Sequence, residues 1–478
     1  MPQVAGRRPP AGGEARAWPT YPGGVALHFV IIGGGPAGNT AATTAARLGA
    51  KVTMIERDIV GGAAHLLDCI PSKAMIATAG AIRDVDASAG MGLSVSDARL
   101  DPEGLRNRIK SIEARLEHNI VDLLRSQDVR MLHGTARLKG PNQVVVETAE
   151  GVREIEADAI LLATGSRPRV PEWAEPDGDR VLTTRDAYPP NEMPEHLVVI
   201  GSGVTGVEFV HMFSSLGSRV SLIVSRQQVL PQKDPEVAAA LEAELLRRGV
   251  ALLKGARAEG IDRTEDGGVA VRCSDGRVAA GSHALLAIGS IPNSDGLGLD
   301  AAGVEVDPSG YVPINHHCVT NVPHIYAAGD VSGKLPLSSV AAMQGRKIAE
   351  HVMGLHTRVH RHLAYDKAAS AIFTEPEIAD VGLAEADAFA EGRKLRVTKV
   401  PFSASAKALI NNETKGFVKI LSDPATGVVL GGSIVGRHAA ELISVLALAV
   451  TNGLRVTDIV ESLLVHPSLS EALADAAE

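Results

Sequence analysis

The sequence is poor in cysteine, in aromatic residues and in long apolar runs. Its 478 residues include three cysteines, Cys69, Cys273 and Cys318, and aromatic side chains make up 3% of the chain. Three widely separated cysteines provide neither a disulfide framework nor the ligand spacing of a zinc site, and they favour a reducing compartment. No apolar run reaches the roughly 18 residues of a membrane span. We therefore expect a cytoplasmic protein without structural disulfides.

An excess of positive charge is also missing. The chain has 47 Lys and Arg against 56 Asp and Glu, a net charge of −9, which offers no attraction to nucleic acid or anionic membranes. Its 45% hydrophobic and 22% charged residues are typical of a globular protein, and its length allows about three domains. Residues 1–24 lack the apolar core of a signal peptide, and we expect a disordered extension or a start site assigned too early.

Glycine, by contrast, occurs in a pattern typical of dinucleotide-binding proteins. An apolar strand is predicted at residues 27–32, followed by a glycine-rich turn, a helix to Leu48 and a strand at 51–55 that ends at Glu56. In this context the glycines allow a tight turn, the approach of a pyrophosphate and close helix packing, and Glu56 can accept hydrogen bonds from a ribose. The turn residues expected at the nucleotide are Gly33, Gly35, Pro36, Ala37 and Gly38.

The same pattern recurs 168 residues farther along the chain. A strand at 197–200 precedes the second turn, and a strand at 219–224 follows its helix. A further repeat relates residues 159–166 to 284–290, which end in Ala-Thr-Gly-Ser and Ala-Ile-Gly-Ser. Two such units imply two nucleotides, and the simplest reason for two is electron transfer between them. Contacts in the second unit are expected at Gly201, Gly203, Val204, Thr205, Gly206 and Gly289.

The two units differ at the ribose position. Val224 stands where the first unit has Glu56, and it is followed by Ser225 and Arg226. A carboxylate would repel the 2′-phosphate of NADPH, whereas a hydroxyl and a guanidinium group can bind it. The sequence therefore permits NADP and modestly favours it over NAD. The alternative, that Arg226 is a solvated loop charge, stays open.

The segment Gly61–Lys73, of sequence GGAAHLLDCIPSK, resembles the active-site segment of the flavoprotein disulfide reductases. In that family two cysteines separated by four residues form a redox disulfide beside a flavin. Here Cys69 matches the second cysteine but Ala64 takes the first position, and a disulfide needs two sulfur atoms within bonding reach. The resemblance spans roughly residues 27–478 and is nearest to actinobacterial quinone-reducing relatives of lipoamide dehydrogenase.

This resemblance implies FAD as a cofactor. Asp330 matches the aspartate that holds the ribityl chain, and a helix predicted at 338–353 points its N-terminus at the flavin. A helix N-terminus favours the negative charge that develops there. Besides the first glycine turn, the resemblance places FAD contacts at Glu56, Arg57, Gly62, Ala63, Lys73, Ala136, Ala163, Thr164, Gly165, Gly329, Asp330, Leu337, Ser338 and Ser339.

The fold that the resemblance implies is α/β, with two Rossmann-like dinucleotide-binding domains and a C-terminal α+β dimerisation domain. The expected boundaries are 25–168 and 293–362 for the FAD domain, 169–292 for the NAD(P) domain and 363–478 for the dimerisation domain. Because the family completes its active site across the dimer, a homodimer is expected.

The resemblance also identifies candidate catalytic residues. Lys73 and Glu208 match a pair that the family places near flavin N5, where an ammonium group stabilises negative charge and the glutamate compensates it. An ordinary surface ion pair is the alternative. Cys69 faces the flavin in the family, either as a thiolate, which needs a lowered pKa, or as a small packed residue.

His466 and Glu471 match a pair that the disulfide reductases supply from the other subunit, where the histidine shuttles protons to a substrate thiol. Without a disulfide, protonation of a reduced acceptor is favoured over thiol chemistry. Ser468 and Glu471 also have the spacing of a helix capping box, which would make Glu471 structural, and both interpretations can hold together.

A histidine pair at His316-His317-Cys318 does not favour a metal site. Adjacent residues on a strand point to opposite faces, and we recognise no other Cys/His cluster nearby, so no metal is expected.

These observations predict an FAD-dependent NAD(P)H:quinone oxidoreductase. Hydride would pass from NAD(P)H to flavin N5, and electrons would then reach a quinone-type acceptor without a redox disulfide, because a quinone can take them from the flavin directly. The alternatives are a soluble pyridine-nucleotide transhydrogenase, a dihydrolipoyl dehydrogenase, which Ala64 disfavours, and a non-catalytic flavoprotein subunit.

Overall fold

The structure, a computed structural model, describes residues 26–94, 98–355 and 362–478. The extension predicted at residues 1–24 lies outside these ranges. Within the ranges that the structure describes, no helix combines the length and the apolar character that crossing a membrane requires.

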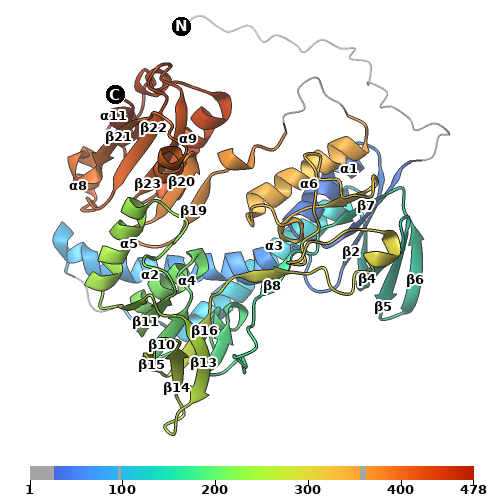
Figure 1. Ribbon diagram of the computed structural model, residues 1–478, viewed down its shortest axis with the longest axis horizontal. Helices are drawn as coiled ribbons and strands as arrows, with labels where there is room; N and C mark the ends of the chain where they lie inside the picture. The colour runs from blue at the N-terminus through green and yellow to red at the C-terminus, as the bar shows by residue number, and fades with distance from the viewer. Residues whose placement is uncertain (1–25, 95–97, 356–361) are drawn as a thin grey trace, which may run out of the picture.

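The first nucleotide-binding unit is a five-stranded parallel sheet covered by helices (Figure 1). Its central strand is fully buried on both faces, which explains the continuous apolar run that the sequence shows there. The strand order is β18 (Ile325–Ala327), β7 (Ala159–Leu162), β1 (His28–Ile32), β2 (Lys51–Glu56), β3 (Arg130–His133). The helices of this unit are α1 (Pro36–Arg47), α2 (Ile70–Ala87), α3 (Pro102–Ser126) and α6 (Ser338–Val352).

The second unit repeats this sheet. Phe29 pairs with Val52 in the first unit, and Leu197 pairs with Val220 in the second, so both partners are displaced by the same 168 residues. The strand order is β12 (Ala251–Lys254), β11 (Arg219–Val224), β10 (His196–Ile200), β16 (His283–Leu286), β9 (Val181–Thr183), and the helices are α4 (Val204–Ser215) and α5 (Pro235–Arg247).

Each unit also carries a three-stranded antiparallel sheet, and a short strand pair joins the two units. The two three-stranded sheets are β4 (Thr135–Gly140), β5 (Gln143–Thr148), β6 (Gly151–Glu156) and β13 (Ala258–Arg263), β14 (Val269–Cys273), β15 (Val278–Gly281). The joining pair is β8 (Ser166–Pro168) with β17 (Ser290–Pro292). The chain passes from the first unit to the second after β8 and returns after β17, so the two connecting segments lie side by side.

The C-terminal region forms a separate core around an antiparallel sheet. This arrangement, with the two parallel sheets, confirms the predicted fold class. The strand order is β19 (Ser370–Ile372), β20 (Ile378–Gly382), β23 (Val429–Val435), β22 (Phe417–Ser422), β21 (Arg396–Pro401). The helices are α7 (Glu385–Ala390), α8 (Ala406–Ile410), α9 (Ala439–Asn452), α10 (Val456–Val460) and α11 (Glu471–Ala477).

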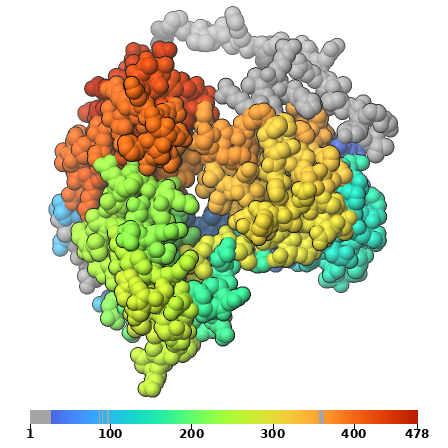
Figure 2. Space-filling view, viewed as in Figure 1, coloured from blue at the N-terminus to red at the C-terminus, as the bar shows by residue number. Residues whose placement is uncertain are grey.

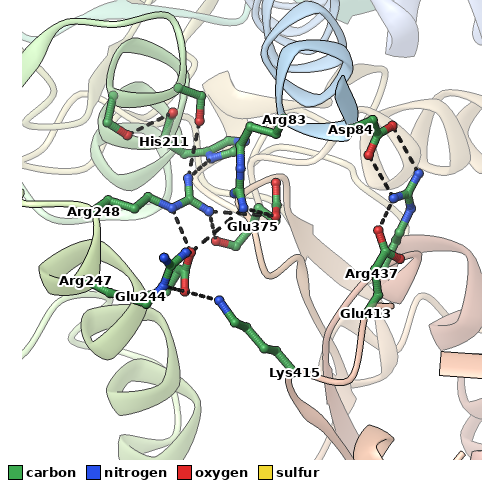
Figure 3. A network of polar contacts seen from close by, with 12 residues as sticks. Arg83, Asp84, His211, Glu244, Arg247, Arg248, Glu375, Glu413, Lys415 and Arg437 are labelled. Carbon is green, nitrogen blue, oxygen red and sulfur yellow. Dashed lines mark hydrogen bonds and ion pairs between the residues drawn. The ribbon is translucent and has the colours of Figure 1, made fainter. Parts of the chain in front are cut away.

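The three regions meet in a polar network that is partly buried (Figure 3). Arg248, which caps the C-terminus of α5, donates to the side chain of Glu244 at 2.9 Å and to the backbone oxygen of Glu375 at 2.7 Å. Its Nη1 atom lies 3.0 Å from Nδ1 of His211 in α4. Arg83 of α2 pairs with the Glu375 carboxylate at 2.5 Å. The network therefore joins the first unit, the second unit and the C-terminal region at one junction.

Two groups of this junction have strongly shifted pKa values. Burial, together with the positive charge of Arg248, lowers the pKa of His211 to about 3, so the imidazole is neutral at physiological pH. Burial works to raise the pKa of Glu244, but hydrogen bonds from Arg247, Lys415 and Arg248 outweigh it and hold that pKa well below its usual range.

Two local structures differ from what the sequence pattern predicts. Residues Ala64–Cys69 form a π-helix, η1, that continues into α2, and the sequence pattern gives no sign of this helix type. His316 and His317 lie in a turn rather than on a strand, so the argument that their side chains point to opposite faces is wrong.

Candidate active site

A cavity of about 1020 Å³ opens between the two nucleotide-binding units and the start of the C-terminal region. Figure 2 shows a hollow between the yellow segment, the green second unit and the orange C-terminal region. Eighteen of the positions predicted for FAD line the cavity: Gly33, Gly35, Pro36, Ala37, Glu56, Arg57, Gly62, Ala63, Lys73, Ala136, Ala163, Thr164, Gly165, Gly329, Asp330, Leu337, Ser338 and Ser339.

The first glycine turn leaves backbone exposed to the cavity. Gly35 caps the N-terminus of α1 without any side-chain hydrogen bond, and the first turn of this helix contains no acidic residue. The Glu56 carboxylate accepts hydrogen bonds from the backbone N–H of Gly34, at 2.7 Å, and of Arg57, at 2.9 Å. Gly38 does not line the cavity but packs against the turn, where a Cβ atom would meet the Gly33 oxygen at 2.0 Å.

The turn at Gly62, which precedes the π-helix, brings this helix against the first glycine turn. Gly62 has a φ of +86°, and a Cβ atom there would lie 2.5 Å from the Cα atom of Gly35. Such an approach between two backbones admits only glycine. It places Ala63 and Ala64 at the cavity wall, beside the N-terminus of α1.

Lys73 and Glu208 meet at the point where the two units face each other. The Lys73 Nζ atom donates to the Glu208 carboxylate at 2.9 Å and lies 4.8 Å from the centre of the Phe373 ring. The other carboxylate oxygen of Glu208 accepts the backbone N–H of Phe373 at 3.0 Å. Because Glu208 is buried whereas a third of the lysine side chain is exposed, the arrangement fixes a cation at the cavity surface.

Cys69 lies one helical turn before Lys73 and also lines the cavity. Burial raises the pKa of the Cys69 thiol, and the positive charge of Lys73 only partly opposes this effect. All three cysteines of the chain are free thiols. A raised pKa favours the thiol form of Cys69 over a thiolate. Its role beside a flavin stays a prediction.

Asp330 and the N-terminus of α6 form a further part of the cavity wall. Ser166 donates its hydroxyl to the Asp330 carboxylate at 2.6 Å, and burial raises the pKa of Asp330. The N-terminus of α6, with Leu337 as its first flanking residue, receives no side-chain cap. Its backbone N–H groups can therefore stabilise negative charge in the cavity.

The second nucleotide turn lies mostly beyond this cavity. Val204, Thr205 and Glu208 reach the cavity wall, whereas the other predicted contacts lie outside it: Gly201, Gly203, Gly206, Ser225, Arg226 and Gly289. Ser225 and Arg226 are exposed immediately after β11, as the sequence comparison placed them. Like Gly33, Gly201 has a φ of +109°, so the two turns have the same backbone geometry.

Several cavity residues were not predicted from the sequence. Arg185 donates from Nη2 to Asp68 of the π-helix at 3.1 Å and to the backbone oxygen of Ser166 at 3.3 Å. His65 also lines the cavity, and burial lowers its pKa. Asp68 and His65 lie among the recognised motif positions, but the partner of Asp68 comes from a distant segment and no local pattern marks either residue.

His466 and Glu471 do not line the cavity of a single chain. The imidazole is largely exposed, and its Nδ1 atom lies 2.7 Å from the Glu471 carboxylate. The other Glu471 oxygen accepts the backbone N–H of Ser468 at 2.9 Å. Glu471 thus orients the histidine and also supports the chain entering α11, although the residue that caps this helix is Ser470 rather than Ser468.

The cavity fits FAD on structural grounds. An uncapped helix N-terminus and closely approaching glycines suit a pyrophosphate, Glu56 can accept ribose hydroxyls, and the Asp330 carboxylate faces the same space. These features come from segments that are distant in sequence and lie around one volume.

Two Rossmann-type units that face each other across one cavity, with a lysine–glutamate pair where they meet, define a dinucleotide-dependent oxidoreductase. The family model for pyridine nucleotide-disulphide oxidoreductases matches residues 27–345, and the model for the dimerisation domain of these enzymes matches residues 368–477. The chain belongs to the pyridine nucleotide-disulphide oxidoreductase family. Its dimerisation domain implies a homodimer, and members of the family typically bind FAD and NAD(P)H.

Relatives match almost the whole chain. An NAD(P)H dehydrogenase (quinone) of Mycobacterium tuberculosis is 40% identical, covering 94% of this chain and 93% of the relative. A dihydrolipoyl dehydrogenase of Chlamydia muridarum is 35% identical, covering 95% of this chain and 96% of the relative. The crystal structure of LpdA from Mycobacterium tuberculosis has a TM-score of 0.89 at 39% identity, covering 95% of this chain and 99% of that chain.

Proposed function

We propose that this protein is an FAD-dependent NAD(P)H:quinone oxidoreductase that works without a redox disulfide. The observation that carries the proposal is the combination of Ala64, which leaves Cys69 without a disulfide partner, with an intact Lys73–Glu208 pair. A dithiol substrate needs a disulfide relay, which this chain cannot form, whereas a quinone does not. The name of the mycobacterial relative supports the same acceptor class.

In this proposal the protein binds, orients and stabilises charge. FAD, when bound, would supply the hydride-accepting and electron-donating chemistry. The glycine turn, Glu56 and Asp330 would hold it, and Lys73 would present its ammonium group to the negative charge that develops during turnover. Glu208 keeps that ammonium group in place through a 2.9 Å hydrogen bond and balances its charge.

We further propose NADPH as the favoured donor. Val224 leaves the ribose position of the second unit without a carboxylate, and Ser225 and Arg226 are exposed directly after it. The 2′-phosphate would bind to their hydroxyl and guanidinium groups.

The proposed domains are residues 25–168 with 293–362 for FAD, 169–292 for NAD(P) and 363–478 for dimerisation.

An anaerobic reductive titration tests the central point. A flavin alone takes up about two electrons, whereas a flavin with a redox disulfide takes up about four. Uptake of about two per FAD is expected for the wild type and for Cys69→Ser. Uptake of four by the wild type would contradict the proposal.

Steady-state assays with NADPH and NADH then compare acceptors. Menadione should be reduced rapidly, and thio-NAD and lipoamide should support little turnover. Preference for thio-NAD would indicate a transhydrogenase, and turnover with lipoamide alone would overturn the proposed function. A lack of turnover with all three would favour a non-catalytic flavoprotein.

A further inference from the structure

Among the residues that the structure describes, four histidines gather on the first unit, away from the cavity described above. His316 and His317 lie in a tight turn that Asn315 organises: its side-chain oxygen accepts the backbone N–H of His317 at 2.8 Å, and its backbone oxygen accepts that of Cys318 at 3.0 Å. Because a turn bends the chain between neighbouring residues, two adjacent side chains can point to the same side, as they cannot on a strand. The rings of His316 and His317 have centroids 4.0 Å apart.

Two other segments bring histidines to this turn. His362 lies in the stretch that leads to the C-terminal region, and its ring centroid lies 4.5 Å from that of His316. His351, in the last turn of α6, stacks on His317 at 4.8 Å. The Tyr326 hydroxyl lies 2.9 Å from Nδ1 of His351, so a residue of β18 fixes the orientation of the stacking ring.

The geometry of three of these histidines suits a metal ion. Ligand nitrogens of His316, His317 and His362 all lie within 4.8 Å of one another. Zinc–nitrogen bonds of about 2.0–2.1 Å in a tetrahedral site separate nitrogens by about 3.4 Å. Rotation of exposed side chains can close the remaining gap, and His316 and His362 are both exposed.

The nature of the ligands selects the ion. Imidazole nitrogens suit zinc, copper, nickel and iron, whereas magnesium and calcium prefer oxygen ligands. Three protein ligands leave a tetrahedral ion with one open position for water or a small anion.

We propose that His316, His317 and His362 form a binding site for a divalent transition-metal ion, represented by Zn²⁺, with His351 as a positioning residue behind His317. The site is independent of the proposed flavin chemistry. A bound ion would tie the turn before β18 to the segment that enters the C-terminal region.

Zinc binding to the full-length, FAD-loaded protein tests the site, after removal of any histidine tag. Competition with a chromophoric chelator at pH 7.5 should show that the protein binds one equivalent of zinc. Binding of this zinc ion should raise the melting temperature of the protein. His316→Ala and His362→Ala should each weaken its binding by about tenfold or more. X-ray absorption should show about three imidazole ligands.

Two control variants separate this site from other zinc-binding groups. His118→Ala removes an exposed histidine of α3, and Cys69→Ser removes the cavity thiol. Both should retain the zinc equivalent. Unchanged zinc affinity in His316→Ala and His362→Ala, with an intact flavin spectrum and unchanged metal-free melting temperature, would overturn the proposal. Loss of the zinc equivalent in Cys69→Ser would assign the ion to the cavity instead.

Discussion

At the scale of single residues, Lys73 is the group whose role the geometry defines most sharply. Its ammonium group is held by a buried carboxylate and an aromatic face and still lines the cavity. Lys73→Met keeps most of the side-chain volume but removes the charge. We expect flavin reduction by NADPH to slow by about a hundredfold or more, the usual effect of deleting a preorganised electrostatic group.

Anaerobic stopped-flow absorbance of the flavin would measure this effect. Lys139→Met is a matched control, because Lys139 forms an exposed ion pair with Glu154 on the antiparallel sheet. The control should reduce its flavin at the wild-type rate. Equal rates in Lys73→Met and Lys139→Met would show that the Lys73–Glu208 pair is only structural.

Arg226 gives a second prediction at this scale. Arg226→Glu places a carboxylate where the 2′-phosphate is expected, and loss of a charged hydrogen bond costs about 1.5–3 kcal/mol. The kcat/KM for NADPH should therefore fall by about ten- to a hundredfold while that for NADH changes little. Arg219→Glu, at the exposed start of β11, is the control. An equal loss for both nucleotides would refute the assignment.

Sequence reasoning at the residue scale found the motif positions and missed their partners. Resemblance to a family placed Lys73 and Glu208 correctly beside each other, although they lie 135 residues apart. The Arg185–Asp68 pair, 117 residues apart, could not be predicted, because no local sequence pattern identifies the partner of a charged residue. Phe373 lies 300 residues from Lys73, and its contact with the lysine needed the three-dimensional structure.

At the scale of elements, the turn at Gly62 determines how closely the π-helix approaches α1. Gly62→Ala adds a methyl group that would lie 2.5 Å from the Gly35 Cα atom, and it also imposes a left-handed conformation on alanine. We expect the variant to purify with much less FAD than the wild type, because the two turns must separate.

Gly49→Ala isolates the backbone effect in this experiment. Gly49 has a φ of +93°, but a Cβ atom there would meet no atom within 4 Å. This control should lose about 1–2 kcal/mol of stability and keep its FAD. Flavin-to-protein absorbance ratios measure the outcome, and a full flavin content in Gly62→Ala would contradict the proposed cofactor position.

Regular elements were the easiest to predict. The strand at 219–224 has its predicted limits, and the helix predicted at 338–353 ends one residue earlier, because buried apolar runs and glycine turns dominate their local energetics. The π-helix at Ala64–Cys69 could not be predicted, since its extra residue per turn leaves no periodic signature in six residues. The histidine turn was misjudged for a related reason, because an Asn-led turn was interpreted as a strand.

At the scale of the whole molecule, the junction of three regions makes stability depend on pH. The pKa of His211 is lowered from 6.5 to about 3 in the folded protein. Between these two pH values the imidazole therefore binds a proton in the unfolded chain but not in the folded chain. The free energy of unfolding should therefore fall as the pH drops from 6.5 towards 3. Over the interval to pH 5 this group accounts for about 2 kcal/mol.

Urea unfolding at pH 7.5 and pH 5, at fixed protein concentration, would measure this loss. His211→Asn keeps an acceptor for Arg248 but cannot titrate, so its stability should decrease by about 2 kcal/mol less than that of the wild type. His118→Asn, on the exposed face of α3, should behave like the wild type. Parallel losses in His211→Asn and the wild type would exclude this origin of acid sensitivity.

Mixed dimers would test whether His466 acts across the subunit interface. If each site combines Lys73 of one subunit with His466 of the other, a dimer of Lys73→Met and His466→Ala subunits contains one fully native site. Random mixing should then restore about a quarter of the wild-type sites. If both residues act within one chain, mixing two inactive homodimers should restore no activity, and an active His466→Ala homodimer would remove His466 from the mechanism.

The strand order of the first sheet also constrains how the chain is made. Strand β18, which completes that sheet, comes from Ile325–Ala327, whereas the second sheet is complete by Leu286. On the ribosome the second unit therefore has all its strands available while the first still lacks one edge. In the nascent chain, one side of β7 therefore stays unpaired until translation has passed β18. The sheet whose first strand is synthesised earliest can therefore be completed only after the second sheet.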